Sequence, residues 1–205
     1  MEDSIWIKKE RERLAELIII RDDFKQIEKI AGIDVTILNN EKLIAAVVVC
    51  DKEFNQIDKA YAIHDLKKEK EQAIYAEGPV IIDAVKKLKI TPDVILINGH
   101  GITHPRLGLA SYIGLALDLS TIGVAKNLRT GKVIDGLVYV NDEIRGYEVI
   151  TRDASKPVYV SPGHKVSLKS SIAIVKDCIK WPHKLPEPLA LAHKYLNKVK
   201  HATVV

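Results

Sequence analysis

The sequence has little of what marks secreted, membrane-bound or low-complexity proteins. Its two cysteines, Cys50 and Cys178, lie far apart and match no metal-binding or redox spacing. Disulfides are rare in reducing compartments, so this cysteine usage favours an intracellular protein. No apolar run approaches the roughly 18 residues that a membrane span needs, and the charged opening MEDSIWIKKERERLAE is not a targeting segment. We expect a cytoplasmic protein with no membrane association.

A strong excess of one charge is also missing. The chain has 31 basic and 27 acidic residues, a net charge of +4 that permits nucleic-acid binding without establishing it. Mixed runs such as KKEKE (67–71) and RDD (21–23) are typical of solvated faces. With 47% apolar residues, 205 residues can form a core without disulfides or a structural metal. We expect a single domain spanning residues 1–205.

Apolar periodicity indicates a mixed α/β fold. Three β-prone segments come first, and the link Asn39-Asn40-Glu41 tolerates the left-handed backbone of a tight hairpin. The continuous apolar runs DVILIN and TIGVAK are typical of strands buried on both faces. The predicted strands span residues 29–38, 42–51, 56–65, 93–98, 121–126, 131–140, 143–152 and 156–164, and the predicted helices span residues 4–19, 68–88, 107–117, 166–180 and 187–200.

Three antiparallel strands joined to two parallel ones, with helices on both faces, form the ribonuclease H-like arrangement. We therefore predict a ribonuclease H-like mixed five-stranded sheet flanked by helices, with an extra hairpin around Asn141-Asp142 and C-terminal helices. This fold commonly holds two divalent cations at carboxylates on its first and fourth strands. Ligands of open α/β sheets gather at the carboxyl ends of the strands.

Three residues fit that position. Asp34 lies within AGIDVT and is costly to bury unless it is paired or binds a metal, although backbone donors at a strand edge would also satisfy it. Glu77 lies among apolar residues in IYAEGPVII, and taken alone it could be an ordinary exposed helix residue. Asn98 ends the fourth strand. A hard cation such as Mg²⁺ prefers oxygen ligands of this kind.

The loop INGHGITHPRLGL (97–109) supplies glycines and hydrogen-bond donors at the same strand end. Glycine lets the backbone approach a ligand closely, and the basic side chains are suited to phosphate contact. A capped turn without function is the alternative. His164 and His193 each fit a structural role when taken alone. The candidate binding residues are Gly99, Gly101, His100, His104 and Arg106, with Lys126 at the end of the next strand.

Five segments together resemble the endonuclease V family in order and spacing. They are GIDV, YAEGPV, GHGITHPRLGLASYIGLALDLSTIGVAKNL, KPVYVSPGHKVSL and LPEPLALAH. The resemblance runs from about residue 28 to about residue 195 and is strongest over residues 97–128.

The resemblance implies a Mg²⁺-dependent nuclease, with Mn²⁺ as a possible substitute, that acts on DNA or RNA containing deaminated purines. The family recognises hypoxanthine or inosine and hydrolyses a phosphodiester bond one nucleotide to its 3′ side; a monomer is the family expectation. By matching positions, the resemblance assigns the metal-binding and catalytic roles to Asp34, Glu77 and Asn98 and a catalytic role to His193. It places Gly99, His104, Arg106 and Lys126 at the nucleic acid, and we expect His100 of the same loop to contact it as a further donor.

The chain departs from the family pattern at three places. Asn98 stands where the family has Asp, which removes one negative charge from the metal site. The stretch LKKEKEQAIYAE (66–77) lacks the Pro-Gly-rich, Tyr-containing wedge, with Ala76 in place of Arg. HPRLG is one residue short, and Tyr112 stands where His is common. We expect slower cleavage from the lost charge at position 98. We also expect weaker lesion recognition, because flipping a base costs a few kcal/mol that the side chains of a wedge help to offset.

Two other functions stay open on this sequence. A homologue that binds nucleic acid without cutting it would keep the basic loop, bind in a salt-dependent manner and show no preference for inosine. A protein-interaction module on the same scaffold is the third possibility, since a fold does not fix a function.

Overall fold

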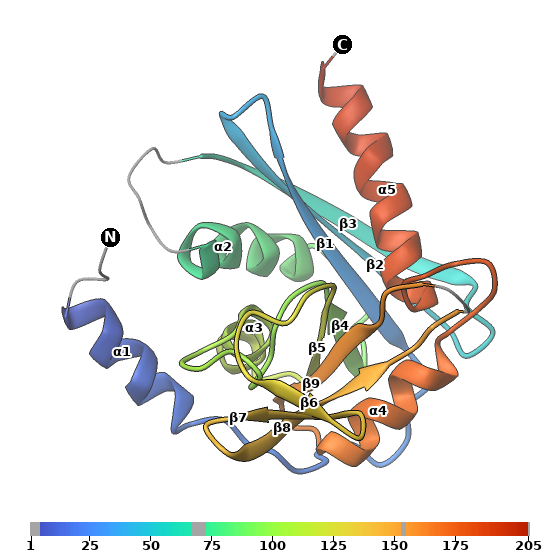
Figure 1. Ribbon diagram of the computed structural model, residues 1–205. Helices are drawn as coiled ribbons and strands as arrows, with labels where there is room; N and C mark the ends of the chain where they lie inside the picture. Colours follow the sequence, from blue (N-terminus) through green and yellow to red (C-terminus); the bar gives the residue numbers. More distant parts are fainter. Residues whose placement is uncertain (1–4, 67–72, 153–154, 205) are drawn as a thin grey trace.

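A computed structural model describes residues 5–66, 73–152 and 155–204, which form one continuous sheet covered by helices (Figure 1). The strand order is β3-β2-β1-β4-β5-β9-β8-β7-β6. The strands are β1 (Ile30–Leu38), β2 (Lys42–Cys50), β3 (Gln56–Asp65), β4 (Val94–Ile97), β5 (Thr121–Ala125), β6 (Lys132–Ile134), β7 (Leu137–Val140), β8 (Glu143–Val149) and β9 (Val158–His164). The helices are α1 (Ile5–Ala15), α2 (Ala73–Lys86), α3 (Leu109–Leu117), α4 (Leu168–Asp177) and α5 (Glu187–Val204).

The first five strands form the predicted ribonuclease H-like unit. Strand β1 pairs antiparallel with β2 and parallel with β4, β2 pairs antiparallel with β3, and β4 pairs parallel with β5. The β1–β2 turn has left-handed residues at Asn39 (φ 51°) and Asn40 (φ 56°), as the sequence indicates. The predicted fold class is confirmed.

The extra hairpin continues the same sheet. Strand β9 pairs antiparallel with β5, and β8, β7 and β6 follow in turn. The prediction of one strand over 131–140 is wrong, because Asp135 (φ 49°) and Gly136 (φ 79°) form a two-residue turn that separates β6 from β7. The helix predicted over 68–88 is described only from Ala73, since residues 67–72 lie outside the described part of the chain.

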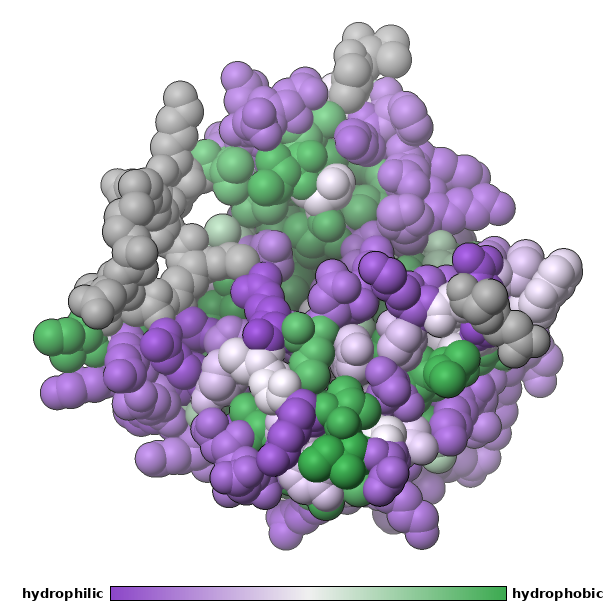
Figure 2. Space-filling model, viewed as in Figure 1, coloured by the Kyte–Doolittle hydropathy of each residue, from purple (hydrophilic) through white to green (hydrophobic). Residues whose placement is uncertain are grey.

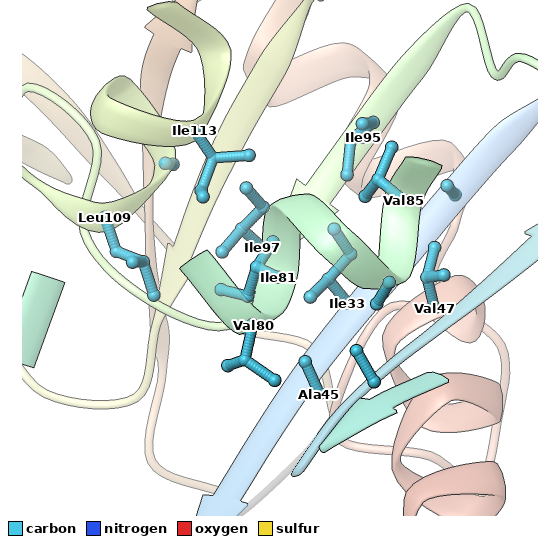
Figure 3. Close-up of a cluster of buried hydrophobic side chains, with 14 of the residues drawn as sticks. Ile33, Ala45, Val47, Val80, Ile81, Val85, Ile95, Ile97, Leu109 and Ile113 are labelled. Carbon is cyan, nitrogen blue, oxygen red and sulfur yellow. The ribbon is translucent and has the colours of Figure 1, made fainter. Parts of the chain in front are cut away.

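Helices cover the two faces of the sheet with separate groups of apolar side chains. On one face α2 and α3 pack against the sheet, in a cluster that includes Ile33, Ile81 and Ile97 (Figure 3), and α1 packs against α3 at the border of this cluster. On the other face α4 and α5 pack against a second set, which includes Leu96 and Leu189. Among the described residues, no helix is long and apolar enough to cross a membrane.

The site lies where β4 ends and β1 continues. Ile33 pairs with Ile97, the last residue of β4, so Asp34 and Asn98 are the next residues on the two neighbouring strands. Because side chains alternate along a strand, Asp34 points away from the Ile33 face and towards α5. The start of α5 lies directly against β1: a Cβ on Gly32 would meet the carbonyl oxygen of Pro188 at 2.0 Å. This close approach brings α5 to Asp34.

Candidate functional site

Asp34 is the centre of the candidate site and is hydrogen-bonded through both carboxylate oxygens. Asn98 Nδ2 donates to Asp34 Oδ1 at 2.9 Å. On the other side, His193 Nδ1 lies 2.7 Å from Asp34 Oδ2. Asp34 is only 6% exposed, and a buried carboxylate needs such partners. The structure therefore joins three of the predicted residues, from β1, the end of β4 and α5, in one cluster.

Glu77 approaches this cluster from α2, on the opposite face of the sheet. It is half-buried and faces the cavity described below. Burial raises the pKa of the Glu77 carboxyl above its ordinary value; the positive charge of Arg129 opposes the rise and the negative charge of Asp34 adds to it. The two carboxylates are thus near enough to interact electrostatically.

A cavity of about 460 Å³ lies beside the cluster. Its walls combine apolar side chains with three arginines, two histidines and one carboxylate, so positive and hydrogen-bonding groups predominate. Such a cavity suits an anionic ligand that also has an apolar surface. The lining residues are Arg11, Ile74, Glu77, Asn98, Gly99, His100, His104, Arg106, Leu109 and Arg129.

The histidines of the 97–109 loop are held as uncharged groups. Burial, followed by the nearby charges of Arg11, His100, Arg129 and Arg106, lowers the pKa of His104 to about 4. Its Nδ1 accepts from the backbone N–H of Arg106 at 3.2 Å, so the neutral ring carries its proton on Nε2. The pKa of His100 is lowered by the same kind of burial. The expectation of a basic His104 is corrected: near neutral pH it is a hydrogen-bond donor and not a cation.

The two loop glycines serve different purposes. A Cβ on Gly101 would lie 2.0 Å from the carbonyl oxygen of Pro162, so this glycine is required for packing against β9. The expectation that Gly101 lets a ligand approach is therefore wrong. A Cβ on Gly99 would meet nothing closer than Leu109 Cβ at 3.4 Å, and Gly99 lines the cavity. Of the two glycines only Gly99 lines the cavity, and its close approach to a ligand stays a prediction.

Two arginines of the cavity were missed by sequence reasoning. Arg11 is buried, and its Nη2 donates to the carbonyl oxygen of Leu107 at 2.8 Å and lies 3.4 Å from both ring nitrogens of His104. Arg129 is exposed and reaches the cavity from the loop after β5. Their sequence signal is weak, since both stand in ordinary polar runs. Lys126, which was predicted, is exposed and is not among the residues that line the cavity.

The structure describes only some of the other departures from the family pattern. Residues 67–72 of the missing wedge lie outside the described part of the chain. Tyr112 packs edge-on against Tyr75, with ring centroids 5.8 Å apart, and its ring fills the space beside Gly78. His164 is buried and accepts from the backbone N–H of Ile19 at 3.3 Å, in agreement with a structural role.

The cluster fits a hard divalent cation held by few protein ligands. Within the described ranges, no three His, Cys, Asp or Glu side chains are grouped as they would be around a metal ion. Asp34 and Glu77 nevertheless supply carboxylate oxygens, and Asn98 supplies an amide. Each oxygen of Asp34 has one hydrogen-bond partner, which leaves further lone pairs. Mg²⁺ is commonly bound by one or two carboxylates, with water and phosphate completing its shell.

The sheet order defines a ribonuclease H-like protein, and its candidate site lies around the buried Asp34 at the end of β4. The family model of endonuclease V matches residues 12–194, and the chain belongs to the endonuclease V family. It is 37% identical over 207 residues to endonuclease V of Dictyoglomus turgidum, covering 95% of this chain and 90% of that one. Endonuclease V of Thermofilum pendens is 36% identical over 201 residues, covering 91% and 86%.

Solved structures agree with this assignment. Endonuclease V of Streptomyces avermitilis superposes with a TM-score of 0.90 at 24% identity, covering 100% of this chain and 96% of that chain, which supports the fold. Endonuclease V of Ciona intestinalis has a TM-score of 0.82 at 26% identity, covering 97% and 98%. The latter was solved in complex with a 24mer DNA that contains an inosine followed by a ribo-adenosine.

Proposed function

We propose that this chain is a divalent-cation-dependent endonuclease that hydrolyses a phosphodiester bond near a deaminated purine, hypoxanthine or inosine, in DNA or RNA. The observation that carries the proposal is the Asp34–Asn98–His193 cluster, which lies at the end of β4 beside a cavity lined by Glu77. The Ciona intestinalis relative, solved with inosine-containing DNA, supports the substrate class.

Asp34 and Glu77 would hold the cation, with the oxygen of Asn98 as a neutral third ligand. When bound, Mg²⁺ or Mn²⁺ would supply an activated water and would neutralise charge on the phosphate. His193 Nδ1 and the Asn98 amide, one on each carboxylate oxygen, would hold Asp34 in a fixed orientation toward the cation. An amide in place of a carboxylate lowers the charge of the ligand set, so we expect weak cation binding and slow cleavage.

The cavity arginines would stabilise negative charge on the substrate. Arg106 and Arg129 both line the cavity, and a guanidinium donates two parallel hydrogen bonds to a phosphate. Buried Arg11 supports the loop by bonding the carbonyl oxygen of Leu107. Donors that are fixed in position before the reaction stabilise developing charge without reorganisation. The neutral His104 would add a hydrogen bond without adding charge.

Cleavage of matched oligonucleotides tests this proposal. DNA and RNA strands that contain inosine are compared with strands that carry adenosine at the same position, in Mg²⁺, in Mn²⁺ and in EDTA. We expect the inosine-containing strand to be cut only when a cation is present. The variants Asp34→Asn and Glu77→Gln should abolish this cutting. Absence of cutting under either cation would refute the proposal.

A binding protein that no longer cuts is the second candidate. The observation in its favour is that Asn98 donates a hydrogen bond to Asp34, which satisfies in part, without a cation, a carboxylate that would otherwise need one. This candidate predicts salt-dependent binding of both strands with equal affinity and no cleavage. The same oligonucleotides therefore distinguish the two functions.

A further inference from the structure

The exposed face of α5 is basic along two turns of the helix. His193, Lys194, Asn197, Lys198 and His201 are all exposed, and their spacing places them on one side of the helix. Figure 2 shows that the surface over α5, at the upper right, is largely hydrophilic. The only acidic residue in the α5 sequence is Glu187, in the first turn. The Glu187 carboxylate pairs with the imidazole of His183, with 2.7 Å between Oε2 and Nδ1, at the end of the helix away from Lys198 and His201.

A groove runs beside this face. A cavity of about 480 Å³ is bordered by the loop before α5 and by the first three turns of the helix. His193, Lys194 and Asn197 line it from the helix, and Lys184 lines it from the loop. The groove therefore offers two ammonium groups, an amide and two imidazoles to a ligand, beside the Glu187 carboxylate and three apolar side chains, Leu185, Ala190 and Leu191.

The basic face begins at the candidate active site. His193 belongs to the face and also contacts Asp34 at 2.7 Å. From residue 193 to residue 201 the helix rises about 12 Å. One strand of duplex DNA advances about 3.4 Å per phosphate, so this length corresponds to about three consecutive phosphates.

We propose that the α5 face, from His193 to His201, binds the phosphate backbone of the substrate strand beyond the bond that is cleaved. The inference rests on the proposed function, because the cleaved bond lies at Asp34. Lysines are matched to phosphates by charge, and Asn197 adds a neutral donor. A protein partner fits less well, since the core of a protein interface is rich in apolar and aromatic residues and the five exposed side chains of this face are all polar.

The salt dependence of binding tests the inference. The double variant Lys194→Ala, Lys198→Ala is compared with the unaltered protein by fluorescence anisotropy on a long inosine oligonucleotide, in EDTA so that no cleavage occurs. We expect the slope of log K against log salt to become shallower by about 1.4 on a single strand and about 1.8 on a duplex, since two phosphate contacts are lost. Unchanged melting temperatures establish that the variant is folded.

A matched variant separates position from net charge. Lys86→Ala, Lys169→Ala removes the same two charges from exposed positions on α2 and α4 that line neither the active-site cavity nor the α5 groove. We expect it to leave the slope within about 0.5 of the unaltered value, since no phosphate contact is lost. Equal slopes for both double variants would overturn the inference.

Oligonucleotide length provides a second arm. On an oligonucleotide trimmed to the few nucleotides around the inosine, the α5 variant should bind as well as the unaltered protein, because the missing lysines have no phosphate to contact. An α5 effect that persists on the trimmed strand would contradict the inference. A shallower slope on the long strand without any inosine preference would support the α5 surface and contradict the proposed function. Inosine-specific cleavage with an unchanged slope would support the proposed function and contradict the role of the α5 surface.

Discussion

Replacing Asn98 by Asp places a second carboxylate against Asp34. In the structure the Asn98 amide donates to Asp34 Oδ1 at 2.9 Å, and an aspartate removes that donor and adds a negative charge. Two unit charges about 4 Å apart repel by about 4 kcal/mol at an effective dielectric constant of about 20. Relaxation and a proton shared between the carboxylates reduce this cost. We expect Asn98→Asp to lose about 2–4 kcal/mol without a divalent cation, which is roughly 4–16 °C in Tm for a chain of this size.

A cation should reverse the effect. The added carboxylate raises the charge of the ligand set, so Mg²⁺ should bind more tightly to the variant. A ligand present at about 100 times its Kd stabilises the folded state by about 2.7 kcal/mol. Thermal melts of Asn98→Asp in EDTA and in increasing Mg²⁺ should therefore show a much larger rise in Tm than melts of the unaltered protein. The cleavage rate at inosine should increase in parallel.

Asn98→Ala is the matched control, because it removes the hydrogen bond without adding a charge. It should lose stability and gain less from Mg²⁺ than the unaltered protein, since Asp34 and Glu77 remain but the third ligand is lost. Asn98-Gly99 is a sequence prone to deamidation, so intact mass spectrometry must first show that the unaltered protein retains its Asn. If Asn98→Asp responds to Mg²⁺ no more strongly than the unaltered protein, position 98 is not a metal ligand and the reasoning is refuted.

Three further perturbations follow from the loop and its supports. Arg11→Ala should cost about 1.5–3 kcal/mol in chemical denaturation, since it removes a buried charged donor. Arg13→Ala, which removes an exposed surface ion pair, should leave the denaturation midpoint nearly unchanged. The pKa of His104 is lowered from 6.5 to about 4, so the folded state disfavours the protonated ring. The stability of the protein should therefore be highest above pH 6.5 and should fall as the pH drops towards 4. His104→Gln should flatten that part of a curve of unfolding free energy against pH. Gly101→Ala should lower Tm because its Cβ meets the Pro162 carbonyl, while Gly99→Ala should keep Tm and weaken oligonucleotide binding.

Much of the fold was predictable because local signals agreed with it. The left-handed Asn39-Asn40 turn and the apolar run DVILIN set the order and direction of the central strands. The turn at Asp135-Gly136 was missed although Asp-Gly is a hairpin signal. Apolar residues on both sides of it gave the appearance of one long strand.

The site was predictable only in part. Asp34 stood out because a carboxylate between apolar residues needs a partner, and the partners proved to be Asn98 and His193. Arg11 did not stand out, since KKERER has the pattern of a solvated helix and its burial against the 97–109 loop is a tertiary effect. The neutral state of His104 was equally hidden, because it depends on burial and on arginines distant in sequence.

We propose that Asp34, Glu77 and Asn98 together hold a divalent cation at the bond that is cut. A crystal structure with Mn²⁺ and an inosine-containing oligonucleotide, using the anomalous signal of the metal, tests this most directly. We expect an ion within about 2.0–2.6 Å of oxygens from all three side chains and from one substrate phosphate. A substrate strand seated in the cavity with no ion among these three residues, or with the ion held elsewhere, would contradict it.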